Sequence, residues 1–336
     1  MAAPRLIDVA RHAGVSMKTV SNVVNGYRHV RPDTRQRVQS AIDALGYRPN
    51  ASARRLATGR TGTIAVVVWT TDVPYFGEIA RALQIAAQAH GQRVVVEQLT
   101  PRTEPERAVL QNRDRGLVDG VIFHPVRLTA DDLANLQPDF PLVLLGEAIR
   151  PTAIDHVGVD NVAAAAAMTE HLIRGGRRSI AFLGRQREPM GETSRQRLTG
   201  YRQALAAAGL PHDPSRELLL DGLSADGGYR VVAAALAGGT RFDALFCRDD
   251  LLAAGAIHAL HDHGVSIPEQ VAVAGWDDLQ ISRHLTPSLT TLATDKAGTA
   301  ETAVELLIDR MNGFTGAGRH RQVEWRVVER ASTRGP

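Results

Sequence analysis

Cysteine is nearly absent from this sequence, and the single Cys247 excludes an intrachain disulfide and a cysteine-rich zinc site. Cys247 ends the apolar run FDALFC, which is typical of a buried strand residue. Long hydrophobic runs are also missing, since none approaches the ~20 residues that a membrane-spanning helix requires. Asp8, Arg11 and His12 interrupt the apolar character of the first residues, so we expect no signal peptide and a cytoplasmic protein.

Familiar catalytic motifs are equally scarce. The chain contains no GxSxG, no HExxH, no phosphate-binding loop and no GxGxxG between a strand and a helix. Only His261 and His263 approach metal-ligand spacing, and we interpret them as solvated residues at a helix end. Acidic pairs at 249–250 and 277–278 could suggest metal or acid–base chemistry, but adjacent residues of a strand point to opposite sides. We therefore expect no enzyme activity, no metal and no cofactor.

Charge is distributed unevenly along the chain. Residues 1–60 contain 11 Lys and Arg against 3 Asp and Glu, a net charge of +8, whereas the rest contains 28 against 33, a net charge of −5. A basic first segment on a mildly acidic body indicates that the first segment binds a polyanion. A solubilising basic surface is the alternative.

Three short helices are predicted in this basic segment. Apolar residues recur at helical spacing at 7, 9, 10 and 13, then at 20, 23 and 24, and then at 38, 41, 42 and 45. Gly14 and Gly46 suit the position after a helix, and Ser16 suits an N-cap. A tight glycine turn between two short helices, the second with a polar face, is typical of a helix-turn-helix.

The segment LIDVARHAGVSMKTVSNVVNGYRHVRPDTRQRVQSAIDALGYRPN, from Leu6 to Asn50, resembles the headpiece of the LacI/GalR family of bacterial repressors. The runs DVA, AGVS, TVS, VVN, TR and GYRPN carry this resemblance, which is far more specific than a bare helix-turn-helix pattern. It implies that the helix beginning at Ser16 enters the major groove of DNA.

The same resemblance assigns DNA contacts within and after this helix. Base-reading positions are occupied by Met17, Lys18 and Asn22. Positions that contact phosphates or sugar edges are occupied by Thr19, Ser21, Asn25 and His29. Ser16 completes the set, although Ser16 and Asn25 could act only as helix caps and Lys18 only as a solvated lysine.

Residues 50–57, NASARRLA, favour a helix that is too short to be stable alone in water. They resemble the family's hinge helix, which forms on DNA and begins here at Asn50. The resemblance implies that small Ala53 lets two such helices pack closely and that Leu56 wedges into the minor groove. A plain linker with one exposed leucine is the alternative.

From Thr63 onward, short apolar runs alternate with longer amphipathic stretches. The runs that predict strands are TIAVVV, RVVVEQL, VDGVIFH, LVLLGE, SIAFLG, ELLLDG, FDALFC and VAVAGW. This alternation predicts doubly wound parallel sheets. The body is too long for one such unit, so we expect two lobes with a boundary near 155–165 and the C-terminal helix crossing near residue 290. Ligands of such folds bind at the carboxyl ends of strands, here between the lobes.

The family resemblance extends through this body and implies a two-lobed, periplasmic-binding-protein-like α/β fold behind an all-α headpiece. VPYF at 73–76 resembles the family's NPFF turn, and RQRLTGYRQAL at 195–205 resembles its RxxGY/F helix start. CRDDLLAAGAIHAL resembles its NDxxAxG segment, VAVAGWDDLQISRHLTPSLTTL its VxGxDD…PxLTT run, and ERASTR its final strand.

Carried over position by position, the resemblance implies an effector cleft lined by Pro74, Tyr75, Phe76, Glu147, Arg197, Leu223, Arg248, Trp276 and Asp277. Arg197 would donate paired hydrogen bonds to ligand oxygens and Asp277 would accept from adjacent hydroxyls. A structural salt bridge between these two residues is the alternative.

Three departures from the family pattern bear on the effector. Arg248 stands where the family usually has a ligand-binding Asn, Leu223 lies near an often aromatic position, and Trp276 replaces a Tyr or Phe. Arg248 could pair with Glu147, or it could select an anionic ligand such as a sugar acid or sugar phosphate.

These observations predict a sequence-specific transcriptional repressor whose operator affinity is controlled allosterically by a small-molecule effector, a sugar or sugar derivative. We expect residues 1–49 to form the headpiece, 50–61 the hinge and linker, and 62–336 the effector-binding and dimerisation domain. No leucine heptad follows Arg334, so we expect a homodimer on a pseudo-palindromic DNA operator. The effector either releases DNA or promotes binding. A transport solute-binding protein or an α/β enzyme is the rival interpretation.

Overall fold

The computed structural model describes residues 4–24, 27, 29–48, 59–99, 106, 117–126, 128, 138–146, 153–187, 190–220 and 222–334. The chain divides into two compact units, Met1–Thr61 and Gly62–Pro336. Within the ranges above, no helix is long and apolar enough to cross a membrane, and no three or more His, Cys, Asp or Glu side chains are grouped as metal ligands.

The first unit contains the three predicted helices. They are α1 (Leu6–Ala13), α2 (Met17–Val24) and α3 (Pro32–Leu45). Val9, Val20 and Val38, one from each helix, are fully buried at the centre of a small shared core. The predicted helix-ending glycines adopt positive φ angles of 64° at position 14 and 60° at position 46, which residues with a side chain rarely adopt.

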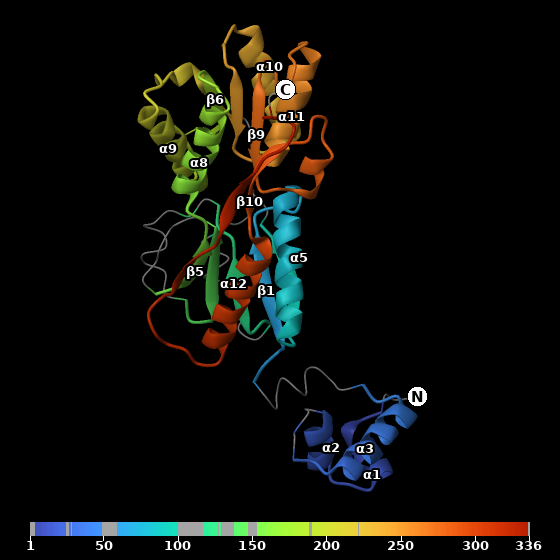
Figure 1. The fold of residues 1–336 in the computed structure, drawn as a ribbon. Coiled ribbons are helices and arrows are strands. Elements are labelled where there is room, and N and C mark those ends of the chain that lie inside the picture. The colour runs from blue at the N-terminus through green and yellow to red at the C-terminus, as the bar shows by residue number, and fades with distance from the viewer. Residues whose placement is uncertain are drawn as a thin grey trace. The chain divides into compact units, whose positions relative to one another are not determined.

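Two six-stranded sheets form the second unit, one in each lobe (Figure 1). The first sheet has the order β11-β5-β4-β3-β1-β2, and its strands are β1 (Thr63–Val68), β2 (Arg93–Gln98), β3 (Gly120–Phe123), β4 (Leu142–Gly146), β5 (Asp155–Gly158) and β11 (His320–Gln322). The second has the order β12-β10-β9-β8-β6-β7, and its strands are β6 (Ile180–Arg185), β7 (Glu217–Leu219), β8 (Ala244–Cys247), β9 (Ala272–Trp276), β10 (Thr290–Thr294) and β12 (Trp325–Val328). Among the strands of the described residues, β12 alone runs antiparallel to its neighbour.

Helices cover these sheets because each has one apolar face. In the first lobe, α5 (Pro74–Ala89) and α12 (Lys296–Met311) pack on each other and on the first sheet. In the second lobe, α8 (Asn161–Arg174) and α9 (Glu192–Ala207) share one core cluster, and α10 (Ala225–Ala237) and α11 (Asp250–Asp262) share another. The short 3-10 helices η1 (Pro214–Arg216) and η2 (Gln280–Arg283) complete this lobe.

All eight predicted strands are present, and the predicted fold class is confirmed. Three further strands, β5, β10 and β11, were not among the predictions, and the final strand that the resemblance implied at ERASTR, residues 329–334, lies just before that run as β12. Two of them, β5 (DHVG) and β11 (HRQ), are short and polar, so they lack the apolar run on which the strand prediction depends.

The chain passes between the lobes three times. It crosses between β5 and α8 at residues 159–160, between β10 and α12 at Asp295, and between β11 and β12 at residues 323–324. The first two crossings agree with the predicted boundary near 155–165 and the predicted crossing near residue 290. The third was not predicted. Because α12 and β11 belong to the first lobe, residues that follow the second lobe in sequence complete the first.

Candidate functional site

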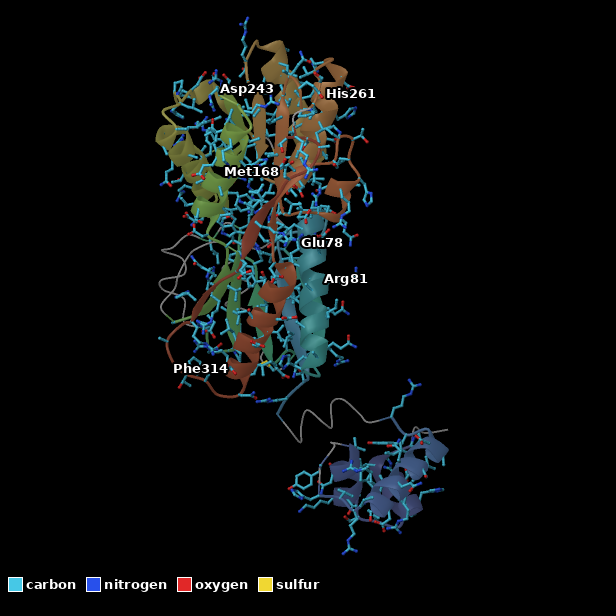
Figure 2. The ribbon with its side chains drawn as sticks, viewed as in Figure 1. Glu78, Arg81, Met168, Asp243, His261 and Phe314 are labelled. Atoms are coloured by element: carbon cyan, nitrogen blue, oxygen red, sulfur yellow. The ribbon has the colours of Figure 1, made fainter. Side chains whose placement is uncertain are left out.

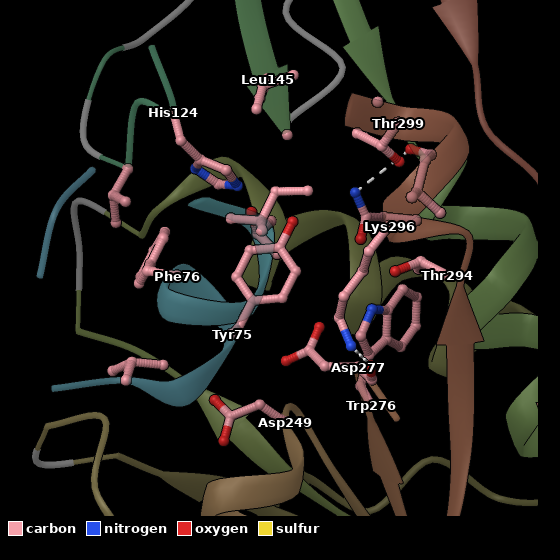
Figure 3. A pocket seen from close by; sticks show the side chains of 18 of the residues that line it. Tyr75, Phe76, His124, Leu145, Asp249, Trp276, Asp277, Thr294, Lys296 and Thr299 are labelled. Atoms are coloured by element: carbon pink, nitrogen blue, oxygen red, sulfur yellow. Dashed lines mark hydrogen bonds between the residues drawn. The ribbon is translucent and has the colours of Figure 1, made fainter. Parts of the chain in front are cut away.

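A pocket lies between the two lobes of the second unit. Its volume is about 880 Å³, including the solvent-filled space at its open mouth. Figure 3 shows the side chains around it, including Tyr75 from α5 and Asp277 from the end of β9. Its wall includes residues at or just after the carboxyl ends of β1, β3, β4, β5, β8 and β9. Parallel sheets place ligand-binding residues at this edge, as the sequence predicted.

The structure brings most of the predicted cleft residues together. The lining includes Tyr75, Phe76, Arg197, Leu223, Arg248, Trp276 and Asp277. Pro74 does not line the pocket; it begins α5 and is exposed, because proline suits the first helical position while the next two side chains turn inward. Glu147 lies outside the described residues.

Arg197 is fixed in place by contacts from three directions. Its guanidinium lies 3.7 Å from the centre of the Trp276 ring. Its Nε donates to Asn161 Oδ1 at 3.0 Å, and its Nη1 donates to the carbonyl oxygen of Arg248 at 2.5 Å. These contacts hold the side chain, 9% exposed, against the pocket wall before any ligand arrives.

Asp277 combines burial with an unusual backbone conformation. It follows β9 with a φ angle of 102°, and its residue is 7% exposed. Burial raises the pKa of Asp277 to about 8, although the positive charge of Arg197 opposes this effect. At neutral pH the Asp277 side chain is therefore mostly a neutral carboxylic acid, which can both donate and accept a hydrogen bond.

The two carboxyls of the acidic pair at 249–250 lie in different environments, one at the pocket and one in the protein interior. Asp249 lines the pocket and caps α11, accepting from the backbone N–H of Leu252 at 2.8 Å. Asp250 is fully buried, and it accepts from Ser282 Oγ and Thr291 Oγ1, both at 2.6 Å. The two carboxyls do not share a site, as predicted, but the reason differs: they lie at the start of a helix and not on a strand.

The pair at 277–278 divides in the same way. Asp278 has a φ angle of 45°, and its carboxylate accepts from Arg330 Nη2 at 2.5 Å. The ion pair between Asp278 and Arg330 connects the end of β9 to the C-terminal segment of the chain. Asp277 alone of the two lines the pocket.

The register of the NDxxAxG segment requires a correction. Counting back from Ala253 and Gly255 places Asp249, and not Arg248, at the Asn position of that motif. The glycine fixes this register, because a Cβ at Gly255 would lie 1.8 Å from the carbonyl oxygen of Ala225 where α10 and α11 cross. The departure from the family pattern is therefore an acidic residue at the Asn position.

Arg248 precedes this position and faces the same pocket. Its Nη1 lies 3.2 Å from Asp249 Oδ2, so the two charges compensate each other. The predicted pairing with Glu147 is not tested, since Glu147 lies outside the described part of the chain.

Several polar lining residues were missed by the sequence analysis. They are His124, Asn161, Thr193, Thr294, Lys296 and Thr299. His124 follows β3 and could have been found as a strand-end residue. Its ring packs edge-on against Tyr75 and Phe76, and burial lowers the pKa of His124 to about 4, so it is neutral near pH 7. Lys296 starts α12 and carried no local signal.

The predicted DNA-contacting residues of the first unit lie on one helix and the segment around it. Ser16, Met17 and Lys18 are exposed, Thr19, Ser21 and Asn22 are half-buried, and His29 is exposed. Ser16 Oγ accepts from the backbone N–H of Thr19 at 3.1 Å, so it caps α2. Asn25, Asn50, Ala53 and Leu56 lie outside the described residues.

One exposed aromatic residue beside α2 was missed. Tyr27 is 56% exposed, its ring packs edge-on against His29, and its carbonyl oxygen accepts from Arg35 Nη2 at 2.6 Å. It adds an aromatic side chain beside the exposed surface of α2, which carries Met17 and Lys18.

A helix-turn-helix unit with a polar exposed helix, followed by a two-lobed body with a polar pocket, defines a regulator that binds DNA and senses a small molecule. Residues 5–50 match the family described as bacterial regulatory proteins, lacI family, and residues 169–333 match the periplasmic binding protein-like domain. The chain belongs to the lacI family of bacterial regulatory proteins, as its relatives also show.

Two of these relatives are similar over nearly their full length. The chain is 34% identical to the HTH-type transcriptional regulator GalS of Salmonella typhimurium, covering 91% of this chain and 89% of that protein. It is 32% identical to catabolite control protein A of Priestia megaterium, covering 98% and 99%.

Solved structures agree. The Lac repressor dimer bound to operator and the anti-inducer ONPF has a TM-score of 0.86 and 26% identity, covering 99% of each chain. The transcriptional regulator CelR–cellobiose complex has a TM-score of 0.71 and 29% identity, covering 98% and 99%.

Proposed function

We propose that this lacI-family regulator is a repressor whose operator affinity is controlled by a sugar or sugar derivative in the pocket between its lobes. The observation that carries this proposal is the group formed by Tyr75, Arg197 and Asp277, which joins a half-buried aromatic side chain to hydrogen-bond donors and acceptors. Fully buried Trp276 stacks against the Arg197 guanidinium and holds it in place. A sugar presents C–H faces to aromatic rings and hydroxyls to planar polar groups. The complex of the similar regulator CelR with cellobiose supports this class of effector.

Charge compensation at two of the cations in the described pocket lining favours an uncharged sugar. Lys296 Nζ lies 2.8 Å from the carboxylate of Glu78, and Arg248 Nη1 lies 3.2 Å from that of Asp249. A sugar acid or sugar phosphate would have to compete with these carboxylates for the cations. The anionic class therefore becomes the alternative outcome of the experiment below.

A thermal-shift panel tests the effector class. Each neutral sugar, including galactose and cellobiose, is paired with a related sugar acid or phosphate, and we expect a neutral member to raise Tm. Arg197→Ala should abolish that shift, whereas Arg195→Ala, on the same helix but outside the pocket lining, should retain it. Stabilisation by anionic sugars alone would exclude the uncharged class, and equal loss in both variants would remove the role of Arg197.

We propose the domain division 1–49 for the headpiece, 50–61 for the hinge and linker, and 62–336 for the effector-binding and dimerisation domain. The separation of the described structure between Thr61 and Gly62 supports the last boundary. A homodimer is supported by large apolar side chains left exposed on the first lobe: Ile85, Val95, Val96 and Leu117. The similar Lac repressor was solved as a dimer on its operator.

The mechanism that we propose is a population shift between two lobe arrangements. One arrangement lets the paired headpieces and hinges bind an operator, and the effector changes operator affinity only by its differential affinity for the two arrangements. Because the relatives are transcriptional regulators, we propose a regulator and not an enzyme, acting on DNA in the cytoplasm.

A further inference from the structure

Glu78 connects the two lobes from outside the pocket lining. Figure 2 shows it on α5, at the end nearer the second lobe. Its Oε1 accepts from the backbone N–H of Gln280 in η2 at 3.1 Å, and its Oε2 accepts from Lys296 Nζ at 2.8 Å. The first of these bonds joins a first-lobe helix directly to the second lobe.

Lys296 continues this connection into the pocket wall. It is the first residue of α12, and its side chain is 15% exposed. Besides Glu78, its Nζ donates to the carbonyl oxygen of Asp277 at 2.5 Å (Figure 3). It also donates to the carbonyl oxygen of Asp278 at 3.4 Å. One ammonium group therefore holds a first-lobe carboxylate and the second-lobe backbone that follows β9.

That backbone is held in a conformation that seldom persists without support. Asp277 and Asp278 both have positive φ, at 102° and 45°, a region that residues with a side chain rarely adopt. Arg330 binds the carboxylate of Asp278, and Lys296 binds the carbonyl of Asp277. The residue whose carboxyl lines the pocket is thus also the residue gripped across the lobe boundary.

We propose that Glu78 and Lys296 are positioning residues that form a clasp between the lobes, and that the clasp sets both the lobe arrangement and the orientation of Asp277. An effector that bonds to the Asp277 carboxyl then acts on the same short segment that the clasp holds. This inference rests on the proposed function only in linking the clasp to an effector. The clasp itself is a property of the free protein.

The test measures the lobe arrangement with neither sugar nor DNA present. Exposed positions on the two lobes, Glu305 on α12 and Gln203 on α9, are changed to cysteine and spin-labelled, while fully buried Cys247 stays in place. The full-length chain is diluted with unlabelled chain, so that distances within one subunit dominate. Pulsed electron resonance then gives the distribution of distances between the labels.

We expect Glu78→Gln to raise the population of the alternative arrangement of the two lobes about tenfold, because the substitution removes a charge-assisted hydrogen bond. Lys296→Met should act in the same direction, and the double variant should shift the distribution no further than the stronger single variant, since both residues serve one clasp. Glu301→Gln is the matched control, because Glu301 is an exposed glutamate of α12 in the same lobe.

A wild-type distribution in both Glu78→Gln and Lys296→Met would overturn the clasp, and so would an equal shift in the Glu301→Gln control. Fully additive shifts in the double variant would overturn the joint action of the two residues. A protein that binds no sugar at all leaves this measurement unchanged, so failure of the effector proposal and failure of the clasp are separate results.

Discussion

The carboxyl of Asp277 owes its chemistry to its surroundings. Burial raises its pKa to about 8, the nearby carboxylates of Asp249 and Asp250 add to this effect, and the cations of Arg197 and Lys296 oppose it. A sugar hydroxyl that donates to this group bonds more strongly to the ionised carboxylate than to the neutral acid. Because the ionised form is the minor one at pH 7, binding that favours it is coupled to the release of a proton.

We predict that sugar affinity rises with pH up to the pKa of Asp277. Below pH 8 the association constant should increase up to about tenfold per pH unit, and above pH 8 it should level off. Calorimetric titration from pH 6.5 to 9 measures this profile, and Asp277→Asn should flatten it. An affinity that falls as pH rises would contradict the assignment of Asp277 as a hydroxyl acceptor.

Lys18 is the subject of the second prediction at the residue scale, because its side chain is exposed on α2 and the family resemblance predicts that this position reads bases. Lys18→Ala should weaken binding to the preferred DNA site by about 1–3 kcal/mol and change the sequences that are preferred. Selection of bound sites from random duplexes, followed by gel-shift titration, measures both effects. Arg11→Ala is the control, because Arg11 is an exposed residue of α1, and this substitution should leave the preferred sequence unchanged.

Individual site residues were predictable where a motif marked the end of an element. Trp276 and Asp277 lie at the end of a predicted strand and Arg197 begins the RxxGY motif, and it was the family resemblance of these motifs that implied their place at the pocket. Asn161 and Lys296 had no such marker, because they reach the pocket only through the crossings between lobes. Their role depends on the path of the chain in space, which local sequence does not encode.

At the scale of elements, the crossing of α10 and α11 leaves no room for side chains between the two backbones. A Cβ at Gly228 would lie 2.4 Å from the carbonyl oxygen of Leu252, and one at Gly255 would lie 1.8 Å from that of Ala225. This contact also places the first turn of α11, with Asp249, at the pocket. Packing of two helices and geometry of the site are therefore linked.

Gly255→Ala should reduce the free energy of unfolding by about 3 kcal/mol, because the backbone must shift to admit the methyl group. Differential scanning calorimetry should show Tm lowered by roughly 6 °C or more. The matched control is Gly77→Ala in α5, where a Cβ would meet nothing within 4 Å, and there we expect a gain of about 0.5–1 kcal/mol. Equal stability of the two variants would show that the contact between α10 and α11 accommodates the added methyl group, which would contradict the prediction.

Elements with an apolar run were predictable, and those held mainly by polar contacts were not. β5 and β11 are fastened to the first lobe through the buried carboxylate of Asp155, which accepts from Arg310 and from Arg319. Burial alone would raise the pKa of Asp155, but these hydrogen bonds outweigh it and lower the pKa to about 2. Because this network joins residues more than 150 positions apart, no local sequence pattern predicts it.

At the scale of the whole molecule, the two compact units predict separable activities. A chain that begins at Gly62 should fold and retain the sugar-dependent thermal shift of the full-length protein, because every described lining residue of the pocket follows this point. It should lose sequence-selective DNA binding in gel-shift titration. A truncated chain that fails to unfold cooperatively, or that has lost its response to sugar, would contradict the independence of the second unit.

The order in which the lobes are completed has a consequence for synthesis. When the ribosome has added residue 294, the sheet of the second lobe lacks only its edge strand β12, but the first lobe still lacks α12 and its edge strand β11. The apolar surface of α5 that α12 will cover remains open on the nascent chain throughout this interval. Helix α5 therefore reaches its native packing only after most of the second lobe has been translated, and a chain cut short before α12 would leave that surface free to aggregate.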